Sequence, residues 1–433
     1  MRKFVLTAAF FILINNNYAQ QVSADIKTPD TVLQHFMDKR FGMFIHWGPV
    51  TLRGTEIGWS RNHEVSQKDY DSLYKEFDPV LFDAEAIVKT AKAAGMKYLT
   101  ITAKHHDGFC LWPSAFTSYN ISNTPYKKDI VGALSKACTK YGIKFCIYYS
   151  VLDWYNKDYP LHNDGNNNPD PKADMARYII YMKDQLKELI TTYHPYMLWF
   201  DGNWEASWTQ AMAVDMYTFI KKIDPSVIIN NRLGKTNHKA ITPETIGDYA
   251  TPEQEIGQLD MNNPWESCIT ICHQWSWKPN DEMKTLSKCI NTLSKTAGGN
   301  GNLLLNVGPM PDGRIEKRQI EQLLKMGKWL QANGQAIYGT KGGPYRPDSV
   351  FSSTRKGNKI FIHLYRDNNG QLNIPAVPGK KIVKAYFLNG AEITFVQKEN
   401  RIIFSWTGLM PDPVCSIIVA EMDGDVDSIP IIQ

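Results

Sequence analysis

Residues 196–202 read YMLWFDG, and residues 97–106 read KYLTITAKHH. Each stretch is a mostly apolar run of strand length that ends in polar or charged residues. Nearly continuous apolar strands are typical of a parallel sheet whose two faces are both buried, whereas a sheet with one solvated face shows strict alternation. The two stretches therefore predict neighbouring strands of a buried parallel sheet.

Similar runs recur on both sides of these two stretches, and they begin at residues 41, 144, 227, 267 and 302. Helical patterns separate several of them. Asp83 can cap a helix that stops at Gly95, and Asp129 can cap one that stops at Gly142. Longer helical patterns cover about residues 173–193 and 315–333. This alternation of strand and helix predicts an α/β fold, a (β/α)8-like TIM barrel.

The pattern changes after Gly342-Gly343-Pro344 to short alternating runs such as KIFIHLY, KIVKAYFL and RIIFSW, with turn signals such as Asn389-Gly390. Such runs predict a C-terminal antiparallel β-sandwich. We therefore expect a barrel catalytic domain at residues 20–340 and a sandwich domain at residues 345–433.

The N-terminus has the order of a secretory signal peptide. Arg2-Lys3 precedes an apolar run from Phe4 to Ile14, and a polar stretch then ends at Tyr18-Ala19-Gln20. The apolar run is short for a membrane anchor. We expect residues 1–19 to be cleaved, and the mature protein to be periplasmic or secreted with no membrane attachment.

Composition narrows the classes of function. The 433 residues are 43% hydrophobic and 21% charged, which excludes global disorder, and the net charge of +4 gives no reason to expect a nucleic-acid partner. Seven cysteines without a CxxC pair do not match a zinc ribbon or a disulfide framework, so we expect mainly structural thiols, with one disulfide still possible. A small or uncharged substrate and no cofactor are the expectation.

The polar residues that end the predicted strands are the candidate site, because barrel active sites lie at the C-terminal strand ends. The strand ends are His46-Trp47, His105-His106-Asp107, Tyr148-Tyr149, Trp199-Phe200-Asp201 and Asn231-Arg232. One interpretation is a metal site, although adjacent histidines on a strand point to opposite faces. The other is a sugar site, with His46, His105, His106, Tyr148 and Arg232 as polar contacts and Trp47, Trp199 and Trp275 as aromatic walls.

Cleavage of a sugar bond needs two carboxyl groups. Asp201 is the best first candidate, because a carboxylate at the end of so apolar a strand is costly unless it is used or paired. The second group is open among Asp248, Glu253, Glu255 and Glu266.

Five motifs resemble, in order, those of the α-L-fucosidases of glycoside hydrolase family 29: RFGMFIHWG, AKHHDGF, LWFDG, PWESCITI and GGNGNLLLNVGPMPDG. The resemblance covers about 300 residues. It implies a retaining exo-α-L-fucosidase with a barrel and a C-terminal sandwich, acting on fucosylated oligosaccharides or glycoconjugates. A silent fucose-binding protein and a metal-dependent barrel hydrolase are the alternatives.

The resemblance also implies roles for residues. Asp201 matches the family nucleophile, and Glu253 in DYATPEQ falls on the loop of the acid/base, with Glu266 in PWESC as the runner-up. The matching fucose-binding positions are His46, Glu56, His105, His106, Tyr148, Trp199, Arg232 and Trp275. Glu56 departs from the family pattern, because Trp59 stands three residues on where a Trp often follows the acid directly.

Overall fold

The structure is a computed structural model, and it describes residues 27–163 and 168–432. The predicted signal peptide, residues 1–19, lies outside the described residues. Within the described part of the chain, no helix is both long and apolar enough to cross a membrane.

Seven parallel strands form one curved sheet. Their order across it is β5-β4-β3-β2-β1-β7-β6, so β2 lies at the centre. The strands are β1 Phe41–Ile45, β2 Tyr98–Lys104, β3 Lys144–Ser150, β4 Met197–Asp201, β5 Ile228–Ile229, β6 Glu266–Thr270 and β7 Asn302–Val307. The seven predicted strands are therefore present, and all of them are parallel.

An extended segment, residues 249–253, closes the gap between the edge strands β5 and β6. Tyr249 pairs with Asn230 beyond β5, and Glu253 pairs with Cys268 of β6, in both cases in parallel. The segment thus occupies an eighth position in the barrel. The sequence predicts only a loop here, because this stretch has no apolar run.

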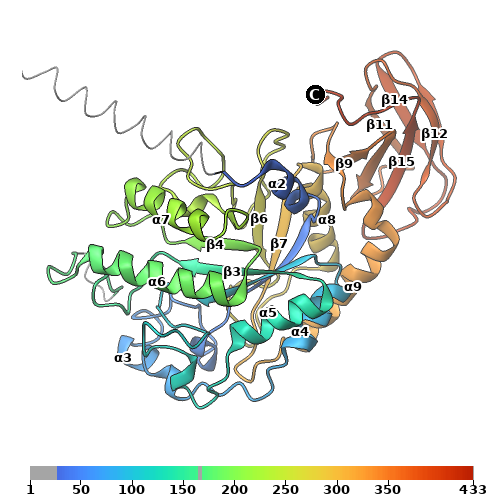
Figure 1. The fold of residues 1–433 in the computed structure, drawn as a ribbon. Helices are drawn as coiled ribbons and strands as arrows, with labels where there is room; N and C mark the ends of the chain where they lie inside the picture. The colour runs from blue at the N-terminus through green and yellow to red at the C-terminus, as the bar shows by residue number, and fades with distance from the viewer. Residues whose placement is uncertain (1–26, 164–167, 433) are drawn as a thin grey trace, which may run out of the picture.

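Helices cover the outside of the barrel (Figure 1). They are α4 Ala84–Ala93, α5 Ile130–Tyr141, α6 Met175–Tyr193, α7 Gln210–Ile223, α8 Leu286–Gly298 and α9 Lys317–Asn333. The shorter α2 Asp30–Met37 packs Phe36 into the inner core, and α3 Gln67–Tyr70 lies between β1 and β2. Short 3-10 helices are η1 Pro49–Leu52, η2 Leu73–Lys75, η3 Ile121–Asn123, η4 Asn231–Leu233 and η5 Gly334–Ala336. The predicted caps form: Asp83 accepts a hydrogen bond from the Ala86 amide, and Asp129 from the Gly132 amide.

Two layers of buried side chains fix which residues face the barrel interior. Phe44, Tyr148 and Trp199 belong to the inner cluster, whereas Trp47 belongs to the larger cluster between the strands and the helices. Successive side chains along a strand alternate between these layers. His46, two residues after Phe44, therefore faces inward with it.

The C-terminal part is an antiparallel sandwich of two sheets, β12-β15-β10-β9-β8 and β11-β14-β13. Its strands are β8 Lys341–Gly342, β9 Phe351–Lys356, β10 Lys359–Leu364, β11 Gln371–Pro375, β12 Ile382–Phe387, β13 Thr394–Gln397, β14 Arg401–Ser405 and β15 Ser416–Met422. It packs beside α8 and α9 (Figure 1), where the Trp329 indole donates to the Cys415 carbonyl at 3.2 Å. The predicted fold class, a TIM barrel followed by a sandwich, is confirmed.

All seven cysteines are buried and unpaired. The possible disulfide therefore does not form, and the thiols pack as small apolar side chains, as predicted.

Candidate active site

Two carboxylates meet at one guanidinium. Arg232 Nη1 donates to Asp201 Oδ1 at 3.0 Å and to Glu253 Oε2 at 2.8 Å. The two oxygens can thus be no farther apart than the sum of these distances, 5.8 Å. Asp201 ends β4, Arg232 lies in η4 after β5, and Glu253 ends the closing segment, so three neighbouring barrel positions supply the group.

Arg232 is held in place by further bonds. Its Nε donates to the Thr251 hydroxyl and its Nη2 to the Thr251 carbonyl, both at 3.0 Å, and its guanidinium lies 4.9 Å from the centre of the Trp199 ring. Burial acts to lower the pKa of Arg232, but the charges of Asp201 and Glu253 outweigh it and raise that pKa. Arg232 is therefore a fixed positive charge between the two acids.

Asp201 receives contacts on its other oxygen. The Tyr148 hydroxyl donates to Asp201 Oδ2 at 3.1 Å, and His106 Nε2 lies 3.7 Å from the same oxygen. The Asp201 side chain is 14% exposed, so it is reachable although its neighbours are buried. This pattern places a partly open carboxylate at the base of a polar cluster.

Three histidines complete the cluster. His46 Nδ1 lies 2.7 Å from Asn306 Oδ1, and His106 Nδ1 lies 2.7 Å from the Ser150 hydroxyl. His105 stacks on Tyr148 with an interplanar angle of 6°. Burial lowers the pKa of His46 and that of His106 to about 3, and it lowers the pKa of His105 as well. All three rings are therefore neutral near pH 7, which suits hydroxyl groups better than anions.

Glu56 and Trp275 lie on two different loops, and hydrogen bonds join these loops beside the site. Glu56 accepts backbone hydrogen bonds from Trp275 at 2.9 Å and from Ser276 at 3.0 Å. The Trp275 ring lies 4.7 Å from that of His46, and its carbonyl accepts from Asn306. Burial raises the pKa of Glu56. Glu56 thus braces the loop that carries Trp275 beside His46.

Glu266 lies deeper in the barrel, away from the carboxylate pair. It is fully buried at the start of β6, where it accepts hydrogen bonds from the Tyr98 hydroxyl and, at 3.2 Å, from the Trp199 indole. Trp199 itself is 2% exposed and stacks on Tyr148. Trp199 therefore supports Tyr148 and Arg232 from within the barrel, and Glu266 supports Trp199.

Trp47 is not a wall of the site, so that prediction is wrong. Its ring packs on Phe77 and Phe82 in the layer between the strands and the helices. The physical reason is strand alternation: His46 faces inward, so the next side chain faces outward.

Asp107, the third polar residue at its strand end, also turns away from the carboxylate pair. It accepts from the Tyr70 hydroxyl at 2.6 Å and from the Phe109 amide at 3.1 Å. Its role is to hold loops together.

Several residues of the site were missed by sequence reasoning. Asn306 near the end of β7 and Ser150 at the end of β3 satisfy the same strand-end rule and orient His46 and His106. Trp59, Trp154 and Trp204 surround His106 with ring separations of 5.5, 5.3 and 5.2 Å. They come from three different loops, and no local pattern brings such residues together.

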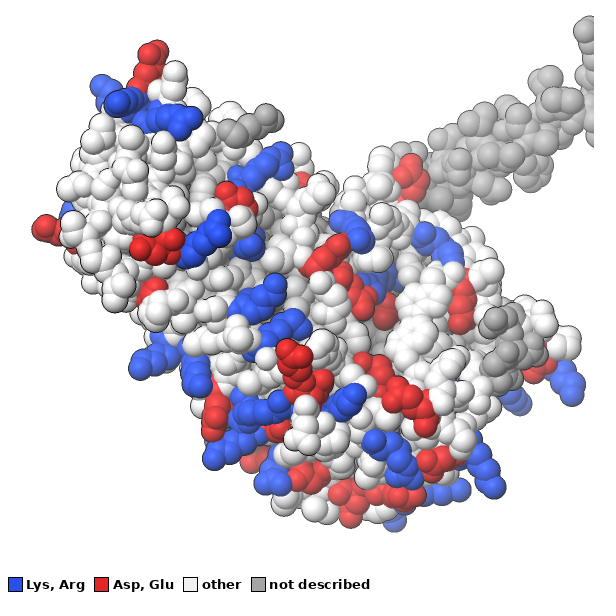
Figure 2. Space-filling view, turned by 180° about the vertical axis from the view of Figure 1, so that it is seen from behind, with Lys and Arg blue, Asp and Glu red and all other residues white. Residues whose placement is uncertain are grey.

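No group of three or more His, Cys, Asp or Glu side chains within residues 27–163 and 168–432 is arranged to hold a metal ion. His46 and His106 instead bond to Asn306 and Ser150, which occupies one ring nitrogen of each of these two. Charges of both signs are interspersed over the face shown in Figure 2, in keeping with the small net charge.

A barrel with two carboxyl groups within 5.8 Å, set among neutral histidines and aromatic rings, defines the class of glycoside hydrolases. Comparison with known proteins agrees. The family model described as Alpha-L-fucosidase matches residues 12–335. The chain belongs to the α-L-fucosidase family, glycoside hydrolase family 29.

Individual relatives cover most of the chain. Tissue alpha-L-fucosidase of Homo sapiens is 30% identical over 374 residues, 78% of this chain and 77% of the relative. Alpha-L-fucosidase isoenzyme 1 of Paenibacillus thiaminolyticus is 33% identical, with a TM-score of 0.84 over 91% of this chain and 99% of its own. A Bacteroides thetaiotaomicron GH29 enzyme, solved as a trapped covalent intermediate with 2-fluoro-fucosyl fluoride, is 29% identical, with a TM-score of 0.83 over 92% and 97%.

Proposed function

We propose that Asp201 is the nucleophile and Glu253 the acid/base with which this α-L-fucosidase releases terminal α-L-fucose from glycans and retains the anomeric configuration. One observation carries the assignment: a single Arg232 nitrogen contacts both acids, so their nearest oxygens lie within 5.8 Å. Retaining enzymes place their carboxyl groups about 5–5.5 Å apart, whereas inverting enzymes need about 6.5–9.5 Å for a water molecule.

The reaction proceeds in two displacements. In the first, an Asp201 oxygen forms a bond to the anomeric carbon while the bond to the leaving oxygen breaks, and Glu253 gives that oxygen its proton. In the second, Glu253 takes a proton from water, the water oxygen bonds to the anomeric carbon, and the Asp201 ester bond breaks. Fucose leaves, and both carboxyl groups return to their starting states.

Arg232 constrains this cycle. Glu253 must bring its proton to the leaving oxygen in the first step, whereas its Oε2 is bonded to Arg232 at 2.8 Å. We therefore infer that the bound sugar separates Glu253 from Arg232, while Arg232 stays on Asp201 and stabilises the charged nucleophile. The Glu253 side chain is 36% exposed, so it has room to move.

The sugar-binding contacts follow from the same cluster. His46, His105, His106 and Tyr148 supply neutral donors and acceptors for hydroxyl groups, and Trp275 supplies a flat apolar face for the methyl side of a deoxy sugar. The fucosylated glycan is the substrate, and it needs no cofactor in this scheme.

Labelling tests the nucleophile directly. Incubation with 2-fluoro-fucosyl fluoride followed by peptide mass spectrometry should find the fucosyl group on Asp201. Asp201→Ala should abolish turnover. A label on another residue contradicts the assignment.

Azide rescue tests the acid/base. Glu253→Ala should lose most activity on poor leaving groups, and azide should restore turnover of an aryl fucoside and yield fucosyl azide of retained configuration. Glu266→Ala is the matched comparison, and rescue of that variant instead would identify Glu266 as the acid/base. If the enzyme releases fucose from neither an aryl fucoside nor a glycan, the alternative of a silent binding protein is favoured. Loss of activity on addition of a chelator would favour the metal-dependent alternative.

We also propose that residues 1–19 are a cleaved signal peptide, that residues 20–340 and 345–433 are separate domains, and that the mature enzyme is periplasmic or secreted. The order of charged, apolar and small residues at the N-terminus supports this location. N-terminal sequencing of the protein from the periplasm or the medium should begin at Gln20, and recovery of Met1 from the cytoplasm would contradict it.

A further inference from the structure

Two exposed tryptophans lie next to the buried site. Trp59 is 45% exposed and Trp204 is 47% exposed, while His46, His105, Tyr148 and Arg232 are each at most 5% exposed. Large aromatic side chains at such exposure are unusual, because burial of an aromatic ring is strongly favourable. The pair therefore marks a rim of aromatic surface above a closed floor.

The two rings lie almost parallel. Their centres are 5.8 Å apart and their planes differ by 23°, so they form an offset stack. Trp154, which is 3% exposed, packs edge-on against Trp59 at 5.4 Å and fixes its orientation. The Trp154 indole in turn donates to Glu205 at 3.3 Å, the residue after Trp204. The stack is therefore held by loops after β1, β3 and β4 rather than left free.

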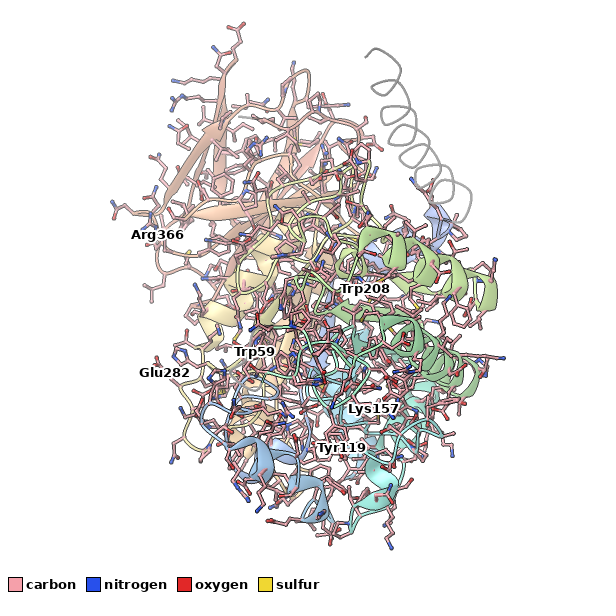
Figure 3. All side chains as sticks on the ribbon, turned by 90° about the vertical axis from the view of Figure 1, so that its left-hand side faces the viewer. Trp59, Tyr119, Lys157, Trp208, Glu282 and Arg366 are labelled. Carbon is pink, nitrogen blue, oxygen red and sulfur yellow. The ribbon has the colours of Figure 1, made fainter. Side chains whose placement is uncertain are left out.

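The two stacked rings lie next to the groups that react. Both exposed rings contact the edge of His106, at 5.5 Å for Trp59 and 5.2 Å for Trp204. His106 Nε2 lies 3.7 Å from the Asp201 carboxylate, and Trp204 is three residues beyond Asp201 in the chain. Figure 3 shows Trp59 on the barrel rather than on the sandwich, which carries Arg366. A ligand held at Asp201 that extends toward solvent therefore meets these two rings.

We propose that Trp59 and Trp204 form the subsite for the leaving group, and that they stack on the pyranose ring to which the fucose is attached. This inference rests on the proposed function. An enzyme that removes a terminal sugar encloses that sugar, so the rest of the glycan leaves through the rim. Pyranose rings present flat C–H faces that pack on indoles, and neither Trp needs a charge on its ligand.

Two fucosyl donors that differ in the size of the leaving group test this subsite. α-L-Fucosyl fluoride has a leaving group too small to reach a stack, whereas an α-fucosyl-N-acetylglucosamine disaccharide places a pyranose there. The unmodified enzyme is first assayed on the α-1,3, α-1,4 and α-1,6 disaccharides, and the one that it cleaves fastest is used. For Trp204→Ala and Trp59→Ala, the kcat/KM ratio of disaccharide to fluoride should fall about tenfold. Trp204→Phe should recover part of the loss.

Phe116→Ala is the matched control. Phe116 is 44% exposed, but the preceding residue, Ala115, bonds to Glu188 near the C-terminal end of α6, away from the C-terminal ends of the barrel strands. Its substrate ratio should equal that of the unmodified enzyme. Equal losses on both donors for the tryptophan variants, or no loss on either, would overturn the subsite while the fucosidase activity stands. Failure of the unmodified enzyme to cleave any donor would instead overturn the proposed function.

Discussion

Replacing Glu266 with Gln should change how stability depends on pH. Burial raises the pKa of Glu266 to about 8, and the hydrogen bonds from Tyr98 and Trp199 oppose this only in part. In the unfolded chain the group has its ordinary pKa of 4.5. Between these values the folded barrel keeps a proton that the unfolded chain releases. The contribution of protonated Glu266 to the free energy of unfolding is therefore fully present below pH 4.5, and it is lost as pH rises toward 8.

The size of the effect follows from proton linkage. One proton contributes about 1.4 kcal/mol per pH unit, so the penalty at pH 7 is about 3 kcal/mol relative to pH 4.5. A Gln side chain has the shape of the protonated acid: its oxygen can accept from the Trp199 indole, and its amide can donate to the Tyr98 oxygen. Glu266→Gln removes the penalty without removing the contacts. It should be close to the unmodified protein in stability at pH 5 and more stable at pH 7.5.

Thermal unfolding measured at several pH values checks this. For a barrel of this size, the Tm of Glu266→Gln relative to the unmodified protein should rise by about 5 °C from pH 5 to pH 7.5. Glu282→Gln is the control, because the Glu282 side chain is 85% exposed and lies at the edge of the view in Figure 3. Its Tm should follow that of the unmodified protein. Parallel curves for Glu266→Gln and the unmodified protein would mean that Glu266 is ionised in the folded barrel.

Three further substitutions separate packing from catalysis. Trp47→Ala should lower the free energy of unfolding by about 3–5 kcal/mol, since Trp47 fills the layer between strands and helices, while the KM of the folded fraction stays the same; denaturant unfolding and fucoside kinetics check both. Tyr148→Phe removes the hydroxyl that donates to Asp201 and should lower kcat/KM at least about tenfold, with thermal unfolding as the check on the fold. Asn306→Ala leaves His46 Nδ1 without its partner and should raise KM about tenfold; an unchanged KM would show that His46 needs no such support.

The ends of the barrel strands can be predicted from the sequence. Strands such as YMLWFDG are legible because burial on both faces leaves a continuous apolar run, and a polar residue at its end is then conspicuous. Parallel strands bring these ends to one edge, so His46, His106, Tyr148 and Asp201 meet as predicted. The partners Asn306 and Ser150 were equally legible, but small polar residues at strand ends are common and do not stand out.

The wrong prediction for Trp47 is one that the alternation of side chains along a strand corrects. His46 and Trp47 are both predicted for the site, although adjacent side chains on a strand face opposite layers. Phe44 in the inner cluster settles which of the two faces inward. The aromatic group around His106 is a different case, because its members come from separate loops and only the folded chain relates them.

Glu253 depends most on tertiary structure. Its segment has no apolar run, and Pro252 cannot donate a backbone hydrogen bond to a neighbouring strand. The segment is held by its neighbours: the Cys268 amide donates to the Pro252 carbonyl, the Gln254 amide to the Cys268 carbonyl, and Arg232 to Thr251. Gln254 then turns the chain away at a φ of 53°.

A strand of high local propensity would continue the barrel past this point and leave the acid fixed in the sheet. A short segment that ends at Glu253 instead presents the carboxylate at the barrel mouth, with its side chain 36% exposed and one bond to Arg232. The same guanidinium that anchors the segment through Thr251 thus also sets the distance between Glu253 and Asp201. Arg232 consequently contributes both to closure of the barrel and to the spacing of the two acids, and a pattern search that finds strands one at a time cannot find such a segment.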